Sequence, residues 1–494
     1  MRSLQTIGIT LVTLLAWFGN ARAQEFTTET FTAGTWTATR NAPASPVAHA
    51  LLLNDGSVLV NSYYFSKHSD PWYRLIPNAK GSYIDGTWTN AGALPSGYNP
   101  LYFGSALLPS GEVVIMGGEY NNASMIWTNK GALYNPATNT WTSLAAPSGW
   151  TTIGDAQSII LPDGHYMQAN CCTTQEAILT LTGTTASWAA TGTGKFDYNS
   201  EEGWTLLPGG DILTVDAYVG VDTFGLMGYQ IYSPTTGAWT TPSNNTVVNT
   251  VNSDENELGP APRLPNGTVF QAGGNTNNAI YTIATGTWAV APSFGGDLDV
   301  ADGPAAVLPD GNALFDASPG VYQTGSEFFE WDGTTMNPTT APPNAPNDSS
   351  YVGNMLVLPT GQVLFTDFSS SVEIYTPAGT ACAGCAPTIK SVAATLTHGS
   401  TNNRITGTQF NGVTQGAYYG DDNQSATNYP IVRITDSAGD AVYCKTYGWL
   451  GGVATGTKLV SAEFTIPATI HTGAASLVVV TNGIPSEAMS VTID

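Results

Sequence analysis

Charged side chains are scarce in this sequence. Asp, Glu, Lys and Arg make up 10% of the residues, and Lys and Arg number 14 against 37 acidic residues. Nucleic-acid binding depends on clustered Lys and Arg that displace counterions from phosphates, so the net charge of −23 argues against a nucleic-acid partner. Helical periodicity and long apolar runs are lacking after residue 23. We therefore expect neither a helical bundle nor a transmembrane segment in the mature chain.

The first residues have the pattern of a signal peptide. Arg2 gives a short basic start, residues 4–18 are apolar, and residues 21–23 (Ala-Arg-Ala) form a small-x-small cleavage pattern. The apolar stretch is too short to cross a bilayer, although an uncleaved anchor is the alternative. The sequence thus predicts a signal peptide over residues 1–23 and a secreted, periplasmic or cell-surface protein.

Glycine and proline are abundant instead, with 54 and 30 copies. Seven times a short apolar run ends in a Leu-x-x-Gly turn and a second apolar run follows, at a spacing of about 50 residues. Such a period is typical of a kelch-type β-propeller, in which each repeat forms one blade. The turns are Leu53–Gly56, Leu108–Gly111, Leu161–Gly164, Leu207–Gly210, Leu264–Gly267, Leu308–Gly311 and Leu358–Gly361.

A series of tryptophans accompanies the turns. Trp36 precedes the first turn, whereas the last repeat reaches Tyr375 and then has no tryptophan. We infer that the strand around Trp36 is the outer strand of the seventh blade, because an unclosed ring would leave unpaired strand edges. A stacked solenoid of seven hairpins is the alternative. The series is Trp36, Trp88, Trp141, Trp188, Trp239, Trp288 and Trp331.

The pattern changes near residue 386. Residues 387–494 contain alternating apolar runs and glycine-rich turns without the turn–tryptophan repeat, which predicts an immunoglobulin-like β-sandwich. The predicted fold class is all-β. A seven-bladed kelch-type β-propeller, closed by its N-terminal strand, covers residues 24–386, and the sandwich follows.

Five cysteines are present. Cys382 and Cys385 are expected to close a small disulfide loop, with a redox pair or a metal knuckle as alternatives. Cys171 and Cys172 could form a vicinal disulfide, stay reduced or pair separately. Cys444 is then a buried thiol or a partner for one of them.

The loops that enter the first strand of a blade, and those that leave its second strand, should surround the central opening. Aromatic residues there can stack on sugar rings, and paired carboxylates can cleave glycosidic bonds. Alternatively, the aromatics pack loops and the carboxylates, Glu257 included, satisfy loop amides or hold a structural cation. The candidate catalytic carboxylates are Glu201, Glu202, Asp155 and Asp302. The candidate ligand-binding residues are His49, Tyr63, Trp72, Tyr102, Tyr120, Trp127, Tyr218, Tyr322 and Tyr351.

Residues 297–303 resemble a calcium loop in composition. Asp297, Asp299 and Asp302 alternate there, without the spacing or the final Glu of an EF-hand. They are the candidate calcium ligands, and no other cofactor is expected.

The repeat followed by an immunoglobulin-like region resembles the galactose oxidase/glyoxal oxidase superfamily over nearly the whole mature chain. Residues 416–422, 427–433 and 479–486 also look like a group of secreted bacterial kelch proteins with a related C-terminal domain. The resemblance implies a propeller with its functional site at the central opening.

The resemblance further implies where copper ligands would stand. Tyr102 occupies the position of the second-blade tyrosine, and residues 351–353 (Tyr-Val-Gly) occupy a Tyr-His-Gly position with valine in place of the ligand histidine. Residues 47–49 lack the crosslinked cysteine, and residues 445–449 have tyrosine where the oxidases have a C-terminal histidine. Copper and copper oxidase chemistry are therefore not expected.

The leading hypothesis is an exported binding protein that recognises a carbohydrate or an extracellular or cell-surface protein through the aromatic and acidic opening. The alternatives are a glycan hydrolase or lyase that uses these carboxylates, and a structural matrix protein.

Overall fold

The fold is all-β, as predicted, and its regular structure consists almost entirely of antiparallel strands. Short 3₁₀ turns include η2 (Ala345–Asn347) and η3 (Ser350–Val352). The predicted signal peptide lies outside the described residues. The computed structural model describes residues 31–63, 71–217, 228–241, 243–245, 247–248, 251, 256–419 and 425–494.

The seven Leu-x-x-Gly turns share one geometry. In each, the glycine amide donates a hydrogen bond of 2.7–3.3 Å to the leucine carbonyl oxygen. The φ angle of the glycine is positive, from 77° at Gly56 to 99° at Gly210. Glycine adopts this left-handed conformation without steric cost, so its spacing in the sequence determines where each pair of strands reverses.

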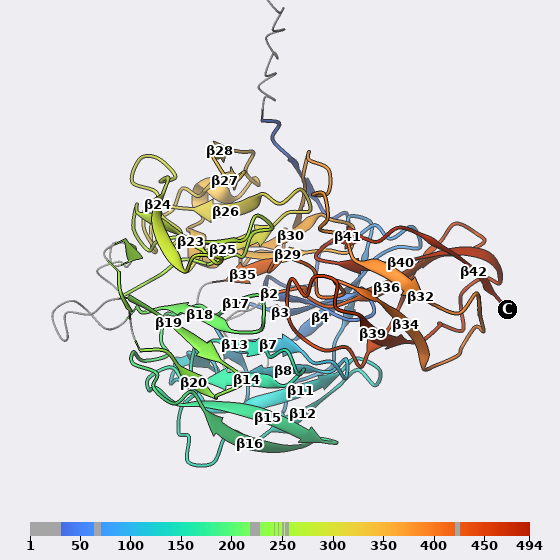
Figure 1. The fold of residues 1–494 in the computed structure, drawn as a ribbon, viewed down its shortest axis with the longest axis horizontal. Coiled ribbons are helices and arrows are strands. Elements are labelled where there is room, and N and C mark those ends of the chain that lie inside the picture. Colours follow the sequence, from blue (N-terminus) through green and yellow to red (C-terminus); the bar gives the residue numbers. More distant parts are fainter. Residues whose placement is uncertain are drawn as a thin grey trace, which may run out of the picture. The chain divides into compact units, whose positions relative to one another are not determined.

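Six of the seven turns join the first two strands of a sheet, and the sheets follow one another along the chain (Figure 1). The fifth turn lies before β22, beside an isolated bridge between Arg263 and Val269. The sheets are β2 (Val47–Leu52), β3 (Val58–Ser62), β4 (Trp72–Ile76) and β5 (Thr87–Asn90); β7 (Gly104–Leu107), β8 (Val113–Met116), β11 (Gly131–Asn135) and β12 (Thr140–Leu144); β13 (Ser158–Ile160), β14 (Tyr166–Ala169), β15 (Glu176–Thr182) and β16 (Thr185–Thr191); β17 (Thr205–Leu206), β18 (Ile212–Val215), β19 (Gly228–Ser233), β20 (Ala238–Trp239) and β21 (Ser243–Asn244); β22 (Thr268–Gln271), β23 (Asn278–Thr282) and β24 (Thr287–Ala291); β25 (Pro304–Val307), β26 (Ala313–Ala317), β27 (Glu327–Trp331) and β28 (Met336–Pro338); β29 (Asn354–Val357), β30 (Val363–Thr366), β31 (Glu373–Thr376) and β1 (Thr35–Ala38). A small further sheet contains β6 (Pro100–Leu101), β9 (Tyr120–Asn121) and β10 (Ser124–Met125).

The N-terminal strand β1 completes the sheet of the last turn. It pairs antiparallel with β31, and Trp36 lies opposite Tyr375. The Trp36 ring also packs edge-on against Phe328 and Phe365, at centroid distances of 5.2 and 5.6 Å. The prediction that the strand around Trp36 pairs at the outer edge of the last repeat is confirmed.

Several of the repeated tryptophans connect a sheet to the preceding one. The Trp141 indole donates a hydrogen bond of 2.9 Å to the Ala91 carbonyl, directly after β5, and Trp188 donates one of 2.8 Å to the Ala145 carbonyl, directly after β12. Such an acceptor satisfies an indole N–H that is shielded from water. The tryptophan series therefore marks contacts between neighbouring repeats as well as strand positions.

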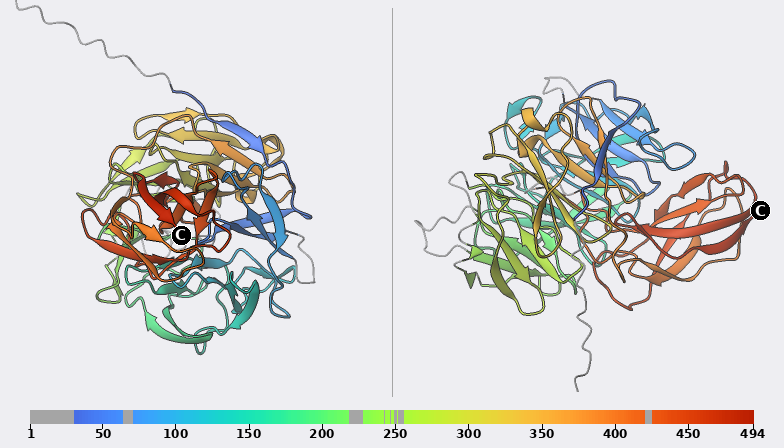
Figure 2. Two further views of the ribbon diagram at one scale, coloured as in Figure 1. Left: turned by 90° about the vertical axis from the view of Figure 1, so that its right-hand side faces the viewer. Right: turned by 90° about the horizontal axis from the view of Figure 1, so that it is seen from above.

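The C-terminal strands form two further sheets, drawn in orange to red in Figure 2. One strand of this region, β35 (Ala417–Tyr419), leaves them and pairs antiparallel with β25. The first of the two sheets contains β32 (Thr388–Ser391), β34 (Asn403–Thr408), β39 (Val460–Phe464) and β38 (Thr446–Tyr447). The second contains β33 (Thr395–Leu396), β42 (Met489–Ile493), β40 (Gly473–Thr481), β36 (Ile431–Thr435), β37 (Ala441–Cys444) and β41 (Ile484–Pro485).

The C-terminal region also contacts the Leu-x-x-Gly turns. The Asn54 amide donates to the Thr446 carbonyl at 2.5 Å, and the Gly448 amide donates to the Pro109 carbonyl at 2.8 Å. Residues 445–449 therefore lie beside the turns and not at the opposite ends of the strands. By contrast, β35 pairs with β25, the first strand of a repeat.

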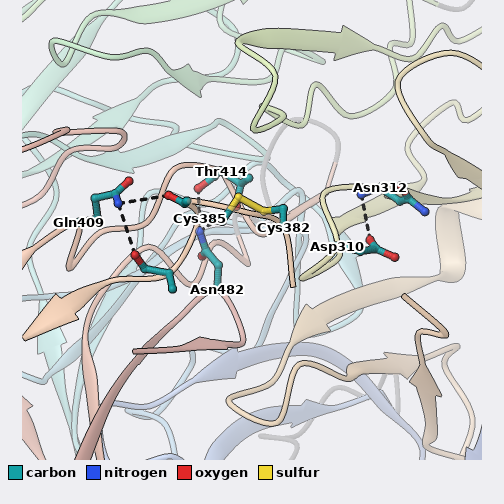
Figure 3. Close-up of a disulfide and its surroundings, with 9 residues drawn as sticks. Asp310, Asn312, Cys382, Cys385, Gln409, Thr414 and Asn482 are labelled. Atoms are coloured by element: carbon teal, nitrogen blue, oxygen red, sulfur yellow. Dashed lines mark hydrogen bonds between the residues drawn. A yellow bond between two sulfur atoms is a disulfide. The ribbon is translucent and has the colours of Figure 1, made fainter. Parts of the chain in front are cut away.

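Cys382 and Cys385 form a disulfide beside the sixth turn (Figure 3). The Cys382 amide donates to the Pro309 carbonyl at 2.8 Å, so the loop is held against that turn. Cys171, Cys172 and Cys444 are free thiols, of which Cys171 and Cys444 are buried.

No helix among the described residues has the length and apolar character that a membrane crossing requires.

Candidate functional site

Five tyrosines, five carboxylates and Leu101 surround a cavity of about 230 Å³, here called the mouth cavity. Eight of these residues are candidates from the sequence, now brought together from different repeats. The tyrosines are Tyr63, Tyr102, Tyr120, Tyr322 and Tyr351, and the carboxylates are Glu119, Asp155, Glu201, Glu257 and Asp302.

Most of these side chains occupy equivalent places in successive repeats, in the loop before the first strand. Closing the sheets around one axis brings such loops together. Three of the residues, Tyr102, Glu201 and Asp302, have positive φ angles of 51°, 57° and 52°. A non-glycine residue in this conformation costs about 1–3 kcal/mol, and such strain often accompanies ligand sites. The equivalent residues are, in chain order, Tyr102, Asp155, Glu201, Glu257, Asp302 and Tyr351.

Three carboxylates lie very close to one another. One oxygen each from Glu201, Glu257 and Asp302 lies within 4.8 Å of the other two. Burial raises the pKa of Glu257, and the neighbouring charges of Asp302 and Glu201 raise it further. Burial also raises the pKa of Asp302. The triad therefore favours bound protons or a bound cation over three free negative charges.

The other two carboxylates extend the acidic wall. Burial, followed by the charges of Asp155 and Asp302, raises the pKa of Glu119 to about 8. Burial raises the pKa of Asp155 to about 6, with a smaller contribution from Asp302. These values lie near neutrality, where a carboxyl group can both donate and accept a proton.

The tyrosines supply the remaining wall. Tyr102 and Tyr120 have ring centroids 6.2 Å apart, and Tyr322 and Tyr351 have centroids 5.7 Å apart. Burial and then the nearby carboxylates raise the pKa of Tyr322 to about 12, so its hydroxyl remains protonated at neutral pH. The Tyr322 side chain is 67% exposed and so accessible to a ligand.

His49 lies beneath this wall. It lines a small adjoining cavity together with Tyr102 and Tyr351. Its Nε2 lies 3.0 Å from the Ser105 hydroxyl, and its Nδ1 lies 3.2 Å from the Asn354 amide nitrogen. Burial lowers the pKa of His49 to about 3, so the ring is neutral. This arrangement is that of a hydrogen-bonded core histidine.

Two predicted aromatic contacts are not part of the lining. Trp72 is 2% exposed and packs against Trp141, with ring centroids 4.8 Å apart, so the expectation of a ligand contact is wrong for Trp72. The ring of Trp127 is exposed, and its amide donates to the Glu119 carbonyl at 3.0 Å, which places Trp127 beside the cavity. Tyr218 lies outside the described residues.

Glu202 points into the protein and not toward the cavity. Its Oε1 lies 2.9 Å from Lys195 Nζ, and both side chains are fully buried. The Thr214 hydroxyl donates to Oε2 at 2.9 Å. The expectation that Glu202 is a catalytic group at the opening is therefore wrong, because its neighbour Glu201 takes the cavity-facing position.

The three calcium candidates do not converge. Asp297 is exposed, and Asp299 accepts the Ala301 amide at 3.2 Å, as a loop-capping residue does. The carboxylates that lie close to Asp302 are Glu201 and Glu257, from other repeats. The expected grouping of Asp297 and Asp299 with Asp302 is thus not found.

Glu119 was missed by the sequence analysis, although its neighbour Tyr120 was a candidate. Glu119 follows β8 directly after two glycines, in a loop that leaves the second strand of a repeat. Its place in such a loop could have identified Glu119 as a candidate from the sequence.

No family model matches the sequence. The Kelch-like protein terF of Aspergillus terreus is 30% identical over 90 residues. The match covers 18% of this chain, which thus spans only 19% of the length of that curated relative.

The solved structures show the fold. A fungal alcohol oxidase of the AA5 family in complex with copper is similar with a TM-score of 0.52, at 14% identity over 94% of this chain and all of that one. A streptogramin B lyase has a TM-score of 0.48, at 9% identity over 70% of this chain and 98% of that chain. The likeness to the alcohol oxidase and to the kelch-like relative supports a galactose oxidase-like kelch β-propeller fold.

Proposed function

We propose that the protein is an exported binding protein whose mouth cavity recognises a carbohydrate or a cell-surface partner. In this proposal the successive sheets are the blades of a seven-bladed propeller over residues 24–386. Residues 387–494 are an immunoglobulin-like sandwich that serves as a spacer or second contact, and residues 1–23 direct export.

One observation carries the proposal: the mouth cavity combines tyrosine rings with carboxylates. Sugar rings stack on aromatic faces through their C–H groups, while their hydroxyls donate hydrogen bonds to carboxylates. The exposed Tyr322 and the half-buried Tyr120 can provide the aromatic faces. A cavity of this size would accommodate a sugar residue or the end of a chain.

We do not expect copper oxidase chemistry here. The described residues of the lining offer only carboxylate and phenol oxygens, whereas copper sites favour imidazole and thiolate ligands. Both ring nitrogens of His49 face hydrogen-bonding partners within 3.2 Å. The donor set is thus a poor fit for copper.

A glycan hydrolase or lyase is the second candidate. It is favoured by the pKa of about 6 at Asp155 and of about 8 at Glu119, which suit proton transfer near neutrality. A structural matrix role is the third candidate, and it predicts self-association without a ligand at the cavity.

A glycan array of the mature protein tests the proposal. We expect Tyr322→Ala and Tyr120→Ala each to weaken binding to the hits by about fivefold, since one aromatic contact contributes about 1 kcal/mol. Tyr198→Ala is the matched control, because Tyr198 is 52% exposed but does not line the cavity.

The array outcomes separate the candidates. Sugar released from a hit would favour the enzyme. Equal loss of binding in Tyr198→Ala would place the site elsewhere. Absence of binding to every glycan would reject carbohydrate recognition and leave a protein partner or a structural role.

A further inference from the structure

We propose that the mouth cavity binds one Ca²⁺ ion through the carboxylates of Glu201, Glu257 and Asp302. This site differs from the Asp297–Asp302 segment that the sequence suggested. It is also independent of the proposed function, because an ion can bind here whether or not a glycan does.

The spacing of the three carboxylates fits this ion. Their converging oxygens lie within 4.8 Å of one another. Two oxygens on opposite sides of a Ca²⁺ ion lie roughly 4.6–5.2 Å apart, because each Ca–O distance is about 2.3–2.6 Å. The three ligands come from consecutive repeats, so the ion would hold three neighbouring loops together.

A second observation points to a missing positive partner. Asp155 lines the same cavity and is only 6% exposed. The Cys171 side chain and the Asp155 backbone also form hydrogen bonds with this carboxylate, but its Oδ1 has no hydrogen-bond partner among the described residues. A buried carboxylate oxygen without a partner costs free energy unless a ligand satisfies it. Asp155 could contact the ion directly or through a bound water.

The buried Glu202 has a positively charged partner, whereas the described lining of the mouth cavity contains no lysine or arginine. Glu202 has a lysine of its own, with Lys195 Nζ at 2.9 Å. The described lining of the mouth cavity has five carboxylates and no lysine or arginine. Protons or a bound cation can supply the compensating charge.

The donor atoms select among cations. Carboxylate oxygens suit hard ions such as Ca²⁺, Mg²⁺ and Mn²⁺, and not the ions that prefer imidazole or thiolate. Mg²⁺ demands a small, regular octahedron and keeps most of its waters, whereas Ca²⁺ accepts irregular sites of six to eight oxygens. Three carboxylates on separate loops, with Asp155 and water nearby, match Ca²⁺ better.

Isothermal titration of the chelator-treated mature protein with CaCl₂ tests the site. We expect saturable binding of one ion per chain and a higher thermal unfolding midpoint in CaCl₂ than in chelator. Glu257→Gln and Asp302→Asn should each weaken Ca²⁺ binding by roughly tenfold or more, because affinity follows the number of charged ligands.

Two control variants make the test specific. Asp297→Asn removes the exposed candidate from the sequence, and Asp436→Asn removes a member of another described group, formed with Asp440 and His471. Both should bind Ca²⁺ as the unmodified protein does. Far-UV circular dichroism verifies that each variant is folded, and Glu201→Gln replaces any that is not.

Two kinds of result would overturn the proposal. The first is no binding at millimolar CaCl₂. The second is unchanged binding in folded Glu257→Gln and Asp302→Asn, or loss of binding in either control variant. If the protein binds Ca²⁺ at this site but binds no glycan, only the proposed function is contradicted.

Discussion

The Gly34 amide donates a hydrogen bond of 3.0 Å to the hydroxyl of Tyr375, 341 residues further along the chain. The same hydroxyl donates to the Glu330 carboxylate and lies 2.9 Å from the Thr339 hydroxyl. One tyrosine thus connects the N-terminal strand β1 with two sheets formed by the last repeats. The N-terminal strand is an integral part of the fold.

Trp36→Ala is expected to destabilise the protein by about 2–3 kcal/mol, somewhat less than a fully buried tryptophan, because Trp36 is partly exposed. It removes the ring contacts to Phe328 and Phe365. Urea unfolding followed by far-UV circular dichroism measures the change. The neighbouring Thr37→Ala, at an exposed position, should be nearly neutral. Equal stability of the two variants would contradict the role of Trp36 in closure.

Glu176→Gln should remove part of the pH dependence of stability. Burial raises the pKa of Glu176 to about 8, against the lowering effects of the Trp239 indole and Lys195. Between about pH 4.5 and 8 the folded protein therefore holds a proton that the unfolded chain releases, so stability falls as pH rises, by on the order of 1 kcal/mol per pH unit. Glutamine keeps a neutral acceptor for Trp239. Parallel stability profiles of the two proteins from pH 5 to about 8 would contradict the assignment.

Lys195→Met should destabilise the protein by about 3–5 kcal/mol, because it leaves buried carboxylates without their counterion. Lys195 Nζ lies 2.9 Å from Glu202 and 3.9 Å from Asp216. Glu202→Gln should also destabilise, and the double variant should lose less than the sum of the two single changes. Denaturant unfolding of the cycle provides the measurement. A stable Glu202→Gln protein that no longer binds or turns over a ligand would instead make Glu202 a functional group.

Cys172 is expected to be the reactive thiol of the folded protein. It is exposed, and a hydrogen bond from Cys171 lowers its pKa, whereas burial raises the pKa of Cys444. A low pKa and access to solvent favour thiolate reactivity. Titration with a chromogenic disulfide reagent should detect about one thiol per native chain, and none in Cys172→Ser. Rapid reaction of further thiols before unfolding would contradict this expectation.

Much of the fold follows from local features of the sequence. Each Leu-x-x-Gly turn needs a residue that tolerates positive φ, and glycine marks that position directly. Trp36 precedes the first turn, and the last repeat lacks a tryptophan. This order also predicted that the strand around Trp36 pairs with the last repeat, as β1 does with β31. The departure of β35 from the C-terminal sheets was not predictable, because a three-residue strand carries no signal for a partner as distant in the sequence as β25.

The candidate site was determined only in part by the sequence. Counting from the turns located the loops around the mouth cavity, since strand length and turn position are local properties. Only the tertiary structure decided which side chains face it. Glu201 and Glu202 are adjacent in the chain, yet the backbone conformation at Glu201 turns one into the cavity and leaves the other beside Lys195. The grouping of Glu201, Glu257 and Asp302 depends in the same way on distances between loops of different repeats, which no local pattern encodes.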